Sequence, residues 1–170
     1  MPTFEAQLQT ARMFAEMARA ANHPFPEMAA AEACLESCFG KSHLAVDGHN
    51  LFGVKQHAHP IYDTIVIPTR EFIDGQWVID GNTAWVKYPS FKESFEDRVA
   101  TLKRLAPKYP HYKAALEAKN PIAFITEVSK TWSTDPQRGD KCIHFFKSYF
   151  PALYAEATAQ PEVTEETPAA

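Results

Sequence analysis

The chain has 170 residues, a length that suits one domain. Hydrophobic residues make up 45% of it, enough to fill a core, and the formal net charge of −4 gives no basic field that would attract nucleic acid. No apolar run approaches the roughly 18 residues of a membrane span, so we expect a globular domain with no nucleic-acid partner and no transmembrane segment.

Two helical segments open the chain. Residues 3–21 place apolar side chains on one stripe, and residues 27–39 repeat this pattern after a break that contains two prolines. We expect the second helix to end at Gly40, with Glu36 in its last turn. Residues 41–60 have no clear period and many polar groups, which favours a loop region with a functional role.

The middle of the chain, residues 62–88, has β character. Asp74-Gly75 separates two runs rich in β-branched and aromatic residues, a strong signal of a hairpin. A second turn at residues 80–82 precedes a third run, Thr83–Tyr88. Pro68 predicts an edge or a bulge, because proline cannot donate to a strand ladder.

Further helices are predicted after the β region, over residues 91–106, 110–118, 121–131 and 136–149. Residues 151–170 are rich in Ala, Pro, Glu and Thr without an apolar period, so we expect a disordered tail after a domain of residues 1–150. The predicted class is α+β, mostly helical with a small antiparallel β-lobe.

Five short blocks carry a specific resemblance. They are AEACLESCFGKS at 31–42, NLFGVK at 50–55, TREFIDG at 69–75, WVKYPSFKESF at 85–95 and WSTDP at 132–136. In the same order, they resemble motifs of the glucosaminidase domains of glycoside hydrolase family 73, which occur in autolysins, flagellar muramidases and phage lysins. The resemblance spans about residues 4–150 and implies a lysozyme-like fold.

The resemblance also implies an activity and two catalytic carboxylates. The expected enzyme is a peptidoglycan hydrolase that needs no cofactor and cuts the β-1,4 bond of glycan strands as an endo-β-N-acetylglucosaminidase. Glu36 would be the general acid that protonates the leaving oxygen. Glu71 would face it from the β-lobe, as a base or as a stabiliser of the oxocarbenium-like charge. Alternatively, the acetamido group of the sugar attacks, and no second carboxylate acts as nucleophile.

Five more residues are expected to shape the saccharide groove. They are Asn50, Phe52, Lys55, Tyr88 and Trp132. Aromatic rings at these positions would either stack on a sugar or anchor the core, and the sequence pattern is compatible with both roles.

The chain departs from the family pattern close to these residues. Glu32 replaces a glutamine, Cys38 a glycine, Phe39 a tryptophan, and Trp132 and Arg138 each a tyrosine. Glu32 shares a helix face with Glu36, so either the two carboxylates together favour one protonated group, or Glu32 lies deeper and hydrogen-bonds the structure. Trp132 and the altered SCFG motif at 37–40 motivate one alternative, an impaired module that binds glycan without cleaving it. A further alternative is an N-acetylmuramidase, which prefers the other glycosidic bond.

Clustered histidines and aspartates raise the question of a metal site. They are His43, Asp47, His49, His57, His59 and Asp63. Their spacing matches no standard zinc pattern, so we expect no metal.

The location of action is also an expectation. Residues 1–21 lack the charged-then-apolar order of a secretory signal. We expect a protein that is made in the cytoplasm and acts on the cell wall after release, through a holin-dependent membrane lesion or a secretion machine. The sequence does not distinguish these two routes.

Overall fold

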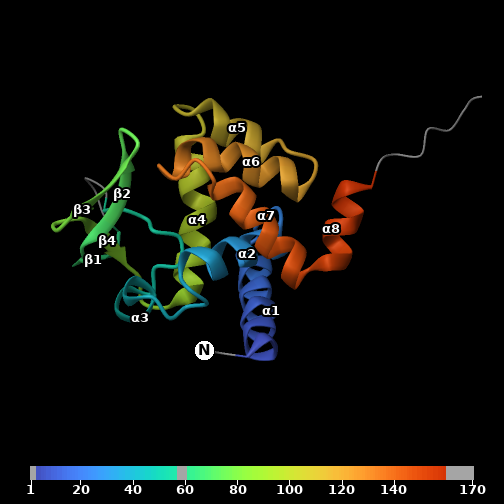
Figure 1. Cartoon of the computed structure of the whole chain (residues 1–170), viewed down its shortest axis with the longest axis horizontal. Helices are drawn as coiled ribbons and strands as arrows, with labels where there is room; N and C mark the ends of the chain where they lie inside the picture. The colour runs from blue at the N-terminus through green and yellow to red at the C-terminus, as the bar shows by residue number, and fades with distance from the viewer. Residues whose placement is uncertain (1–2, 57–60, 160–170) are drawn as a thin grey trace, which may run out of the picture.

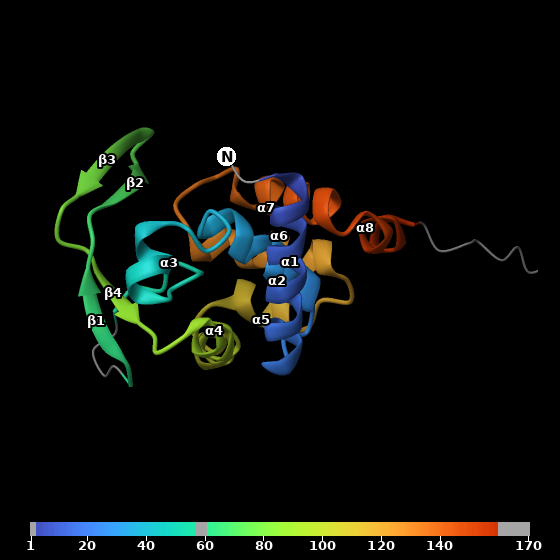
Figure 2. The same cartoon turned by 90° about the horizontal axis from the view of Figure 1, so that it is seen from below.

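The structure is a computed structural model that describes residues 3–56 and 61–159. Its helices form one body, the strands lie at one end of it, and helix α8 lies at the other end (Figures 1 and 2). The expected α+β class, mostly helical with a small antiparallel β-lobe, is confirmed.

Helices α1 (Phe4–Ala20) and α2 (Pro26–Glu36) pack against each other. Thr3 caps α1, because its hydroxyl accepts a hydrogen bond from the Ala6 amide at 3.3 Å. Helix α2 is rich in alanine, whose small side chain lets neighbouring helices approach closely. It ends at Glu36, several residues before the glycine at which we expected it to stop.

A short helix, α3 (His43–Gly48), lies in the segment that was expected to be a loop. Ser42 caps it by accepting a hydrogen bond from the Ala45 amide at 3.2 Å. Its length of six residues is too short to give a readable helical period, which is why the sequence pattern did not indicate it.

Among the described residues, the β-lobe contains two separate antiparallel pairs. The expected hairpin is formed by β2 (Thr69–Ile73) and β3 (Gln76–Asp80), joined by Asp74-Gly75 with φ of 51° and 79°. Strand β4 (Ala84–Lys87) pairs with β1 (Asp63–Val66). Pro68 lies between β1 and β2, where the chain passes from one pair to the other.

Four helices complete the expected body: α4 (Phe91–Leu105), α5 (Pro110–Leu116), α6 (Pro121–Trp132) and α7 (Arg138–Tyr149). The expected disordered tail is wrong for its first part, because Pro151–Thr158 forms helix α8. Proline is favoured at a helix start and alanine inside a helix, and Tyr154 packs against Phe146. Residues 160–170 lie outside the described part.

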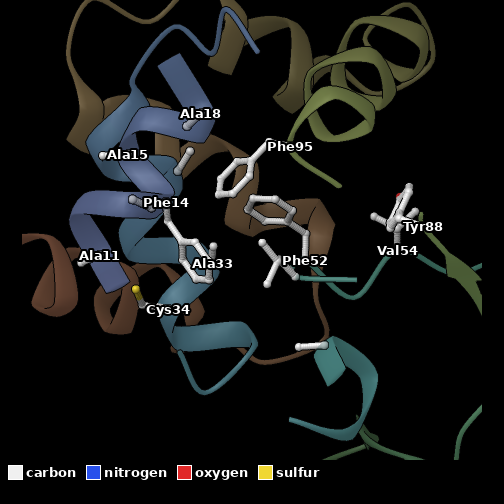
Figure 3. Close-up of a cluster of buried hydrophobic side chains, with 14 of the residues drawn as sticks. Ala11, Phe14, Ala15, Ala18, Ala33, Cys34, Phe52, Val54, Tyr88 and Phe95 are labelled. Carbon is white, nitrogen blue, oxygen red and sulfur yellow. The ribbon is translucent and has the colours of Figure 1, made fainter. Parts of the chain in front are cut away.

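Helix α2 separates two hydrophobic clusters. Ala29, Ala30, Ala33 and Cys34 face one cluster. It includes Phe14, Phe52 and Phe95, whose side chains lie close together in Figure 3. Met28 and Ala31 face the other cluster, built with α5, α6 and α7. Because α2 is buried on both sides, Glu36 at its end is held against a rigid body. Within the described residues, no helix is long and apolar enough to cross a membrane.

Candidate active site

A cleft of about 400 Å³ opens beside the β-lobe. Its wall combines residues from the end of α2, the segment 52–55, strands β2 and β4, helices α4 and α5, and the end of α6. The described lining residues are Glu36, Phe52, Gly53, Val54, Lys55, Arg70, Trp85, Thr101, Leu105, Tyr112, Thr131, Trp132, Ser133 and Thr134. Among them, Glu36 is the carboxylate.

A tight turn follows Glu36. Cys38, Phe39 and Gly40 all have positive φ, of 51°, 57° and 76°. Ser37 stabilises this turn, because its hydroxyl donates to the Ala33 carbonyl at 2.5 Å and accepts from the Gly40 amide at 2.7 Å. Each non-glycine residue with this conformation costs about 1 kcal/mol, so the packing around the turn compensates for strain directly beside the candidate acid.

Glu36 forms an ion pair with Arg138 from the first turn of α7. Arg138 Nε donates to Glu36 Oε1 at 2.6 Å, and the Glu36 side chain keeps 28% of its surface exposed. Arg138 itself is 2% exposed. The pair therefore joins a buried cation to a carboxylate that reaches the cleft.

Glu32 lies one helical turn below Glu36 and is fully buried. It accepts hydrogen bonds from Arg138 Nη2 and from Arg98 Nη2, the latter at 2.5 Å. Burial opposes its ionisation, but the two guanidinium groups outweigh that effect and hold the pKa of Glu32 below its usual range. Of the two roles considered for Glu32, the structure supports the deep, hydrogen-bonded one.

Arg98 is held by aromatic rings as well as by Glu32. Its guanidinium carbon lies 3.6 Å from the centroid of the Trp132 ring and 5.3 Å from that of Phe52. Its Nε and Nη1 have no hydrogen-bond partner among the described residues. Contact with aromatic faces partly replaces the lost hydration of such a cation.

Asn50 was expected in the groove, but the structure places it in the interior. Its amide donates to the Val54 and Val86 carbonyls, each at 2.9 Å, and its Oδ1 accepts from the Val54 amide at 3.0 Å. The expected sugar contact is therefore corrected: Asn50 joins the segment 50–55 to β4, because its one side chain satisfies both backbones.

Tyr88 was also expected in the groove and is also buried. Its hydroxyl donates to Asp97 at 2.6 Å, and burial together with this hydrogen bond raises its pKa. Tyr88 is not among the described lining residues of the cleft. Its role in this structure is to join β4 to α4.

Phe52, Lys55 and Trp132 all line the cleft. Phe52 is nevertheless almost fully buried and meets Phe95 edge to face, with ring centroids 5.2 Å apart, so it is mainly a core anchor. Lys55 Nζ lies 5.8 Å from the centroid of the Trp85 ring. Trp132 donates its indole N–H to the Phe52 carbonyl at 2.9 Å.

Glu71 lies in β2, where its backbone is opposite Val78 of β3. Its side chain is outside the described set, so its expected position across the cleft stays a prediction. In the part of the chain that the structure describes, no three or more His, Cys, Asp or Glu side chains form a group suited to a metal ion. His57 and His59 lie outside the described residues.

Sequence reasoning missed several residues of this site. It noted Arg138 only as a departure from the family pattern, and it did not identify Arg98, Arg70 or Tyr112. One signal was present: the extra carboxylate at Glu32 and the extra cation at Arg138 both replace neutral residues of the family. Two opposite charges gained at neutral positions indicate a pair, if the positions lie close in space.

Comparisons with known proteins show the family of the chain. The glucosaminidase family model, described as mannosyl-glycoprotein endo-beta-N-acetylglucosaminidase, matches residues 11–150. A probable N-acetylmuramidase of Lactococcus lactis subsp. lactis is 29% identical over 149 residues, 85% of this chain and 33% of that protein. The exo-glucosaminidase LytG of Bacillus subtilis is 31% identical over 134 residues, 75% of this chain and 45% of its own length.

A solved structure shows the same fold. The catalytic domain of the autolysin Auto from Listeria monocytogenes superimposes with a TM-score of 0.70 at 29% identity, covering 91% of this chain and 88% of that domain. Fold and cleft thus define a lysozyme-like glycoside hydrolase domain. The chain belongs to the glucosaminidase family. It spans about a third of the length of its Lactococcus relatives.

Proposed function

We propose that this domain hydrolyses β-1,4 glycosidic bonds in the glycan strands of peptidoglycan, as an endo-β-N-acetylglucosaminidase with Glu36 as general acid. The observation that carries the proposal is the place of Glu36: a carboxylate at the end of a buried helix, partly exposed in the cleft and held by one ion pair. Cleavage of a glycosidic bond requires a proton on the leaving oxygen, and a positioned carboxyl group supplies it.

The test is clearing of purified sacculi by the wild type and by Glu36→Gln. We expect the variant to lose at least about a hundredfold in rate, a typical effect of removing a general acid. Glu16→Gln is the matched control, because Glu16 lies on α1 with 76% of its side chain exposed. Equal clearing by wild type and Glu36→Gln would contradict the proposal, and binding of sacculi without clearing by the wild type would favour the impaired glycan-binding module.

The bond that is cut distinguishes two activities. The name of the Lactococcus relative favours N-acetylmuramidase cleavage, whereas the family description and the name of the Bacillus relative favour a glucosaminidase. Mass spectrometry of the products separates the two. New reducing ends of N-acetylglucosamine support our proposal, and new reducing ends of N-acetylmuramic acid replace it with the muramidase.

Glu71 is the proposed partner of Glu36, either as base or as stabiliser of the developing positive charge. Glu71→Gln should then lower kcat strongly while leaving the stability of the fold unchanged. In the rival mechanism, the acetamido group of the substrate attacks its own anomeric carbon. This attack closes a ring between the acetamido group and the anomeric carbon. Inhibition by a thiazoline analogue of this cyclic intermediate would support the rival mechanism, as would products that retain the anomeric configuration.

The same proposal includes the place of action, the cell wall after release from the cytoplasm by a membrane lesion or a secretion machine. Production of the domain in the cytoplasm of a bacterium should leave the cells intact. Co-production of a holin should cause lysis, and Glu36→Gln should abolish that lysis. Lysis without a holin would contradict release through a membrane lesion.

A further inference from the structure

The guanidinium group of Arg138 is divided among three acceptors on two other helices. Its Nε donates to Glu36 Oε1 at 2.6 Å, its Nη2 donates to Glu32 Oε1, and its Nη1 donates to Ser129 Oγ at 3.0 Å. Arginine often binds one carboxylate with two parallel hydrogen bonds. Here one edge of the guanidinium serves two carboxylates, which fixes the distance between them.

The charges of this cluster balance. Arg98 and Arg138 are cations, Glu32 and Glu36 are anions when ionised, and three of the four side chains are almost fully buried. Without Glu36, the other three groups carry one net positive charge. Arg138 therefore places a buried positive charge directly beside Glu36, and Glu32 balances part of the charge of the two arginines.

The hydrogen-bond pattern also determines where a proton can sit on Glu36. Arg138 Nε carries one hydrogen and donates it to Oε1, so Oε1 must accept. A proton on Oε1 would compete with that hydrogen. The transferable proton therefore belongs on Oε2, the other oxygen of a carboxyl group that lines the cleft.

We propose that Arg138 is a positioning residue for Glu36: it directs the transferable proton to Oε2, and its charge, balanced by Glu32, sets the alkaline limit of activity. This inference rests on the proposed role of Glu36 as proton donor. Arg138 itself acts through Glu36 and does not need to touch the substrate.

Other titratable groups face this cluster from several elements. Burial raises the pKa of Cys142 on α7 to about 12 and also raises the pKa of Tyr112 on α5, so both stay neutral near neutral pH. His23, before α2, is buried, and its pKa is lowered to about 4, so it too is neutral there. The charged groups around Glu36 are therefore Glu32, Arg98 and Arg138, and Lys55 and Arg70 line the same cleft. Asp135, which pairs with Lys141, also interacts electrostatically with Arg138.

The test is the pH profile of kcat/KM on soluble glycan strands for two neutralising variants. Arg138→Gln removes the positive charge beside Glu36, so its alkaline limb should move up by about one pH unit. Glu32→Gln removes the balancing negative charge, so its limb should move down. A purely structural role of the cluster would lower activity without shifts of opposite sign.

Arg138→Lys keeps the positive charge and loses the planar guanidinium group with its several N–H donors. We expect its alkaline limb to stay closer to that of the wild type, while kcat falls about tenfold because one ammonium group cannot hold both carboxylates in place. Lys141→Gln is the matched control, since it removes a positive charge from the same helix at an exposed pair with Asp135. Its profile should match that of the wild type.

The inference is overturned if circular dichroism shows that Arg138→Gln and Glu32→Gln are both folded and the alkaline limbs of their pH profiles either stay in place or move in the same direction. Should Glu32→Gln fail to fold, the comparison of Arg138→Gln with Arg138→Lys decides alone, and equal limbs overturn it. Full activity of Glu36→Gln would instead overturn the proposed function, so the two failures are distinguishable.

Discussion

The indole ring of Trp132 lies over the guanidinium group of Arg98, with 3.6 Å between the guanidinium carbon and the ring centroid. The same indole donates its N–H to the Phe52 carbonyl at 2.9 Å. Trp132 thus connects the end of α6 to α4 and to the segment that carries Phe52, three parts of the cleft wall. The tryptophan that replaces a family tyrosine therefore has a structural role here.

Trp132→Phe and Trp132→Ala should separate the two contacts of this ring. Phenylalanine keeps an aromatic face for Arg98 and loses the hydrogen bond to the Phe52 carbonyl, which costs about 1 kcal/mol. Alanine also removes the ring and leaves a cavity beside a buried cation, for a total of about 3–5 kcal/mol. Urea denaturation measures both free energies of unfolding, and equal losses in the two variants would contradict the stacking on Arg98.

The order of the five sequence blocks was enough to predict the fold. Each block has a local physical reason, such as the Asp74-Gly75 turn or the capping serine before α4, and local chemistry is visible in sequence. Glu36 at the end of α2 could be predicted for the same reason. Helix α8 was missed because its alanines form no amphipathic stripe, although alanine and an initial proline favour a helix.

The charge network could not be predicted, because it depends on contacts between distant parts of the chain. Arg138 is 102 residues from Glu36 and 106 from Glu32, and Arg98 is 66 from Glu32. Asn50 and Tyr88 were misplaced for a related reason. A polar side chain in a sequence motif suggests a contact with substrate. Only its burial in the fold shows whether it instead forms hydrogen bonds with groups of the protein interior.

Asn50→Ala should destabilise the domain more than Asn120→Ala does. Asn50 satisfies three buried backbone groups, so its removal should cost at least about 2 kcal/mol. Asn120 is the matched control, because its side chain caps α6 at a partly buried site by accepting a hydrogen bond from the Ala123 amide, which is worth about 1 kcal/mol. Chemical denaturation compares the two, and a smaller loss at Asn50 would disprove its role in joining the backbones.

His23 should make stability depend on pH. Burial, and next the charge of Arg98, lower its pKa from 6.5 to about 4. The folded state holds His23 neutral, so the unfolded state binds a proton first as the pH falls. The contribution of His23 to stability is therefore fully present above pH 6.5 and should fall by about 3 kcal/mol between pH 6.5 and pH 4.

His23→Asn tests this dependence. Its side-chain oxygen can accept from the Phe25 amide as His23 Nδ1 does, but it does not titrate. The free energy of unfolding, followed by urea denaturation across this pH range, should vary less in the variant. His43→Asn is the control, because His43 is exposed. The free energy of unfolding of this variant should depend on pH as that of the wild type does. An unchanged slope in His23→Asn would show that other groups cause the loss.

Lys55 and Arg70 place two cations on the cleft wall that also holds Glu36. Peptidoglycan strands carry carboxylates, whereas oligomers of N-acetylglucosamine are neutral. Under the proposed function, Lys55→Gln and Arg70→Gln should each lower kcat/KM on peptidoglycan strands about fivefold, as expected for an ion pair worth about 1 kcal/mol. Activity on the neutral oligomers should change little.

Added salt should reduce the difference between the wild type and both variants, because it screens attraction between exposed charges. Lys92→Gln is the matched control: Lys92 lies on α4 in an exposed pair with Glu96 and is not among the described residues that line the cleft. It should leave both substrates unaffected. If Lys55→Gln lowers activity on neutral and anionic substrates equally and independently of salt, Lys55 supports the wall through Trp85, over whose ring its ammonium lies, and does not attract the substrate.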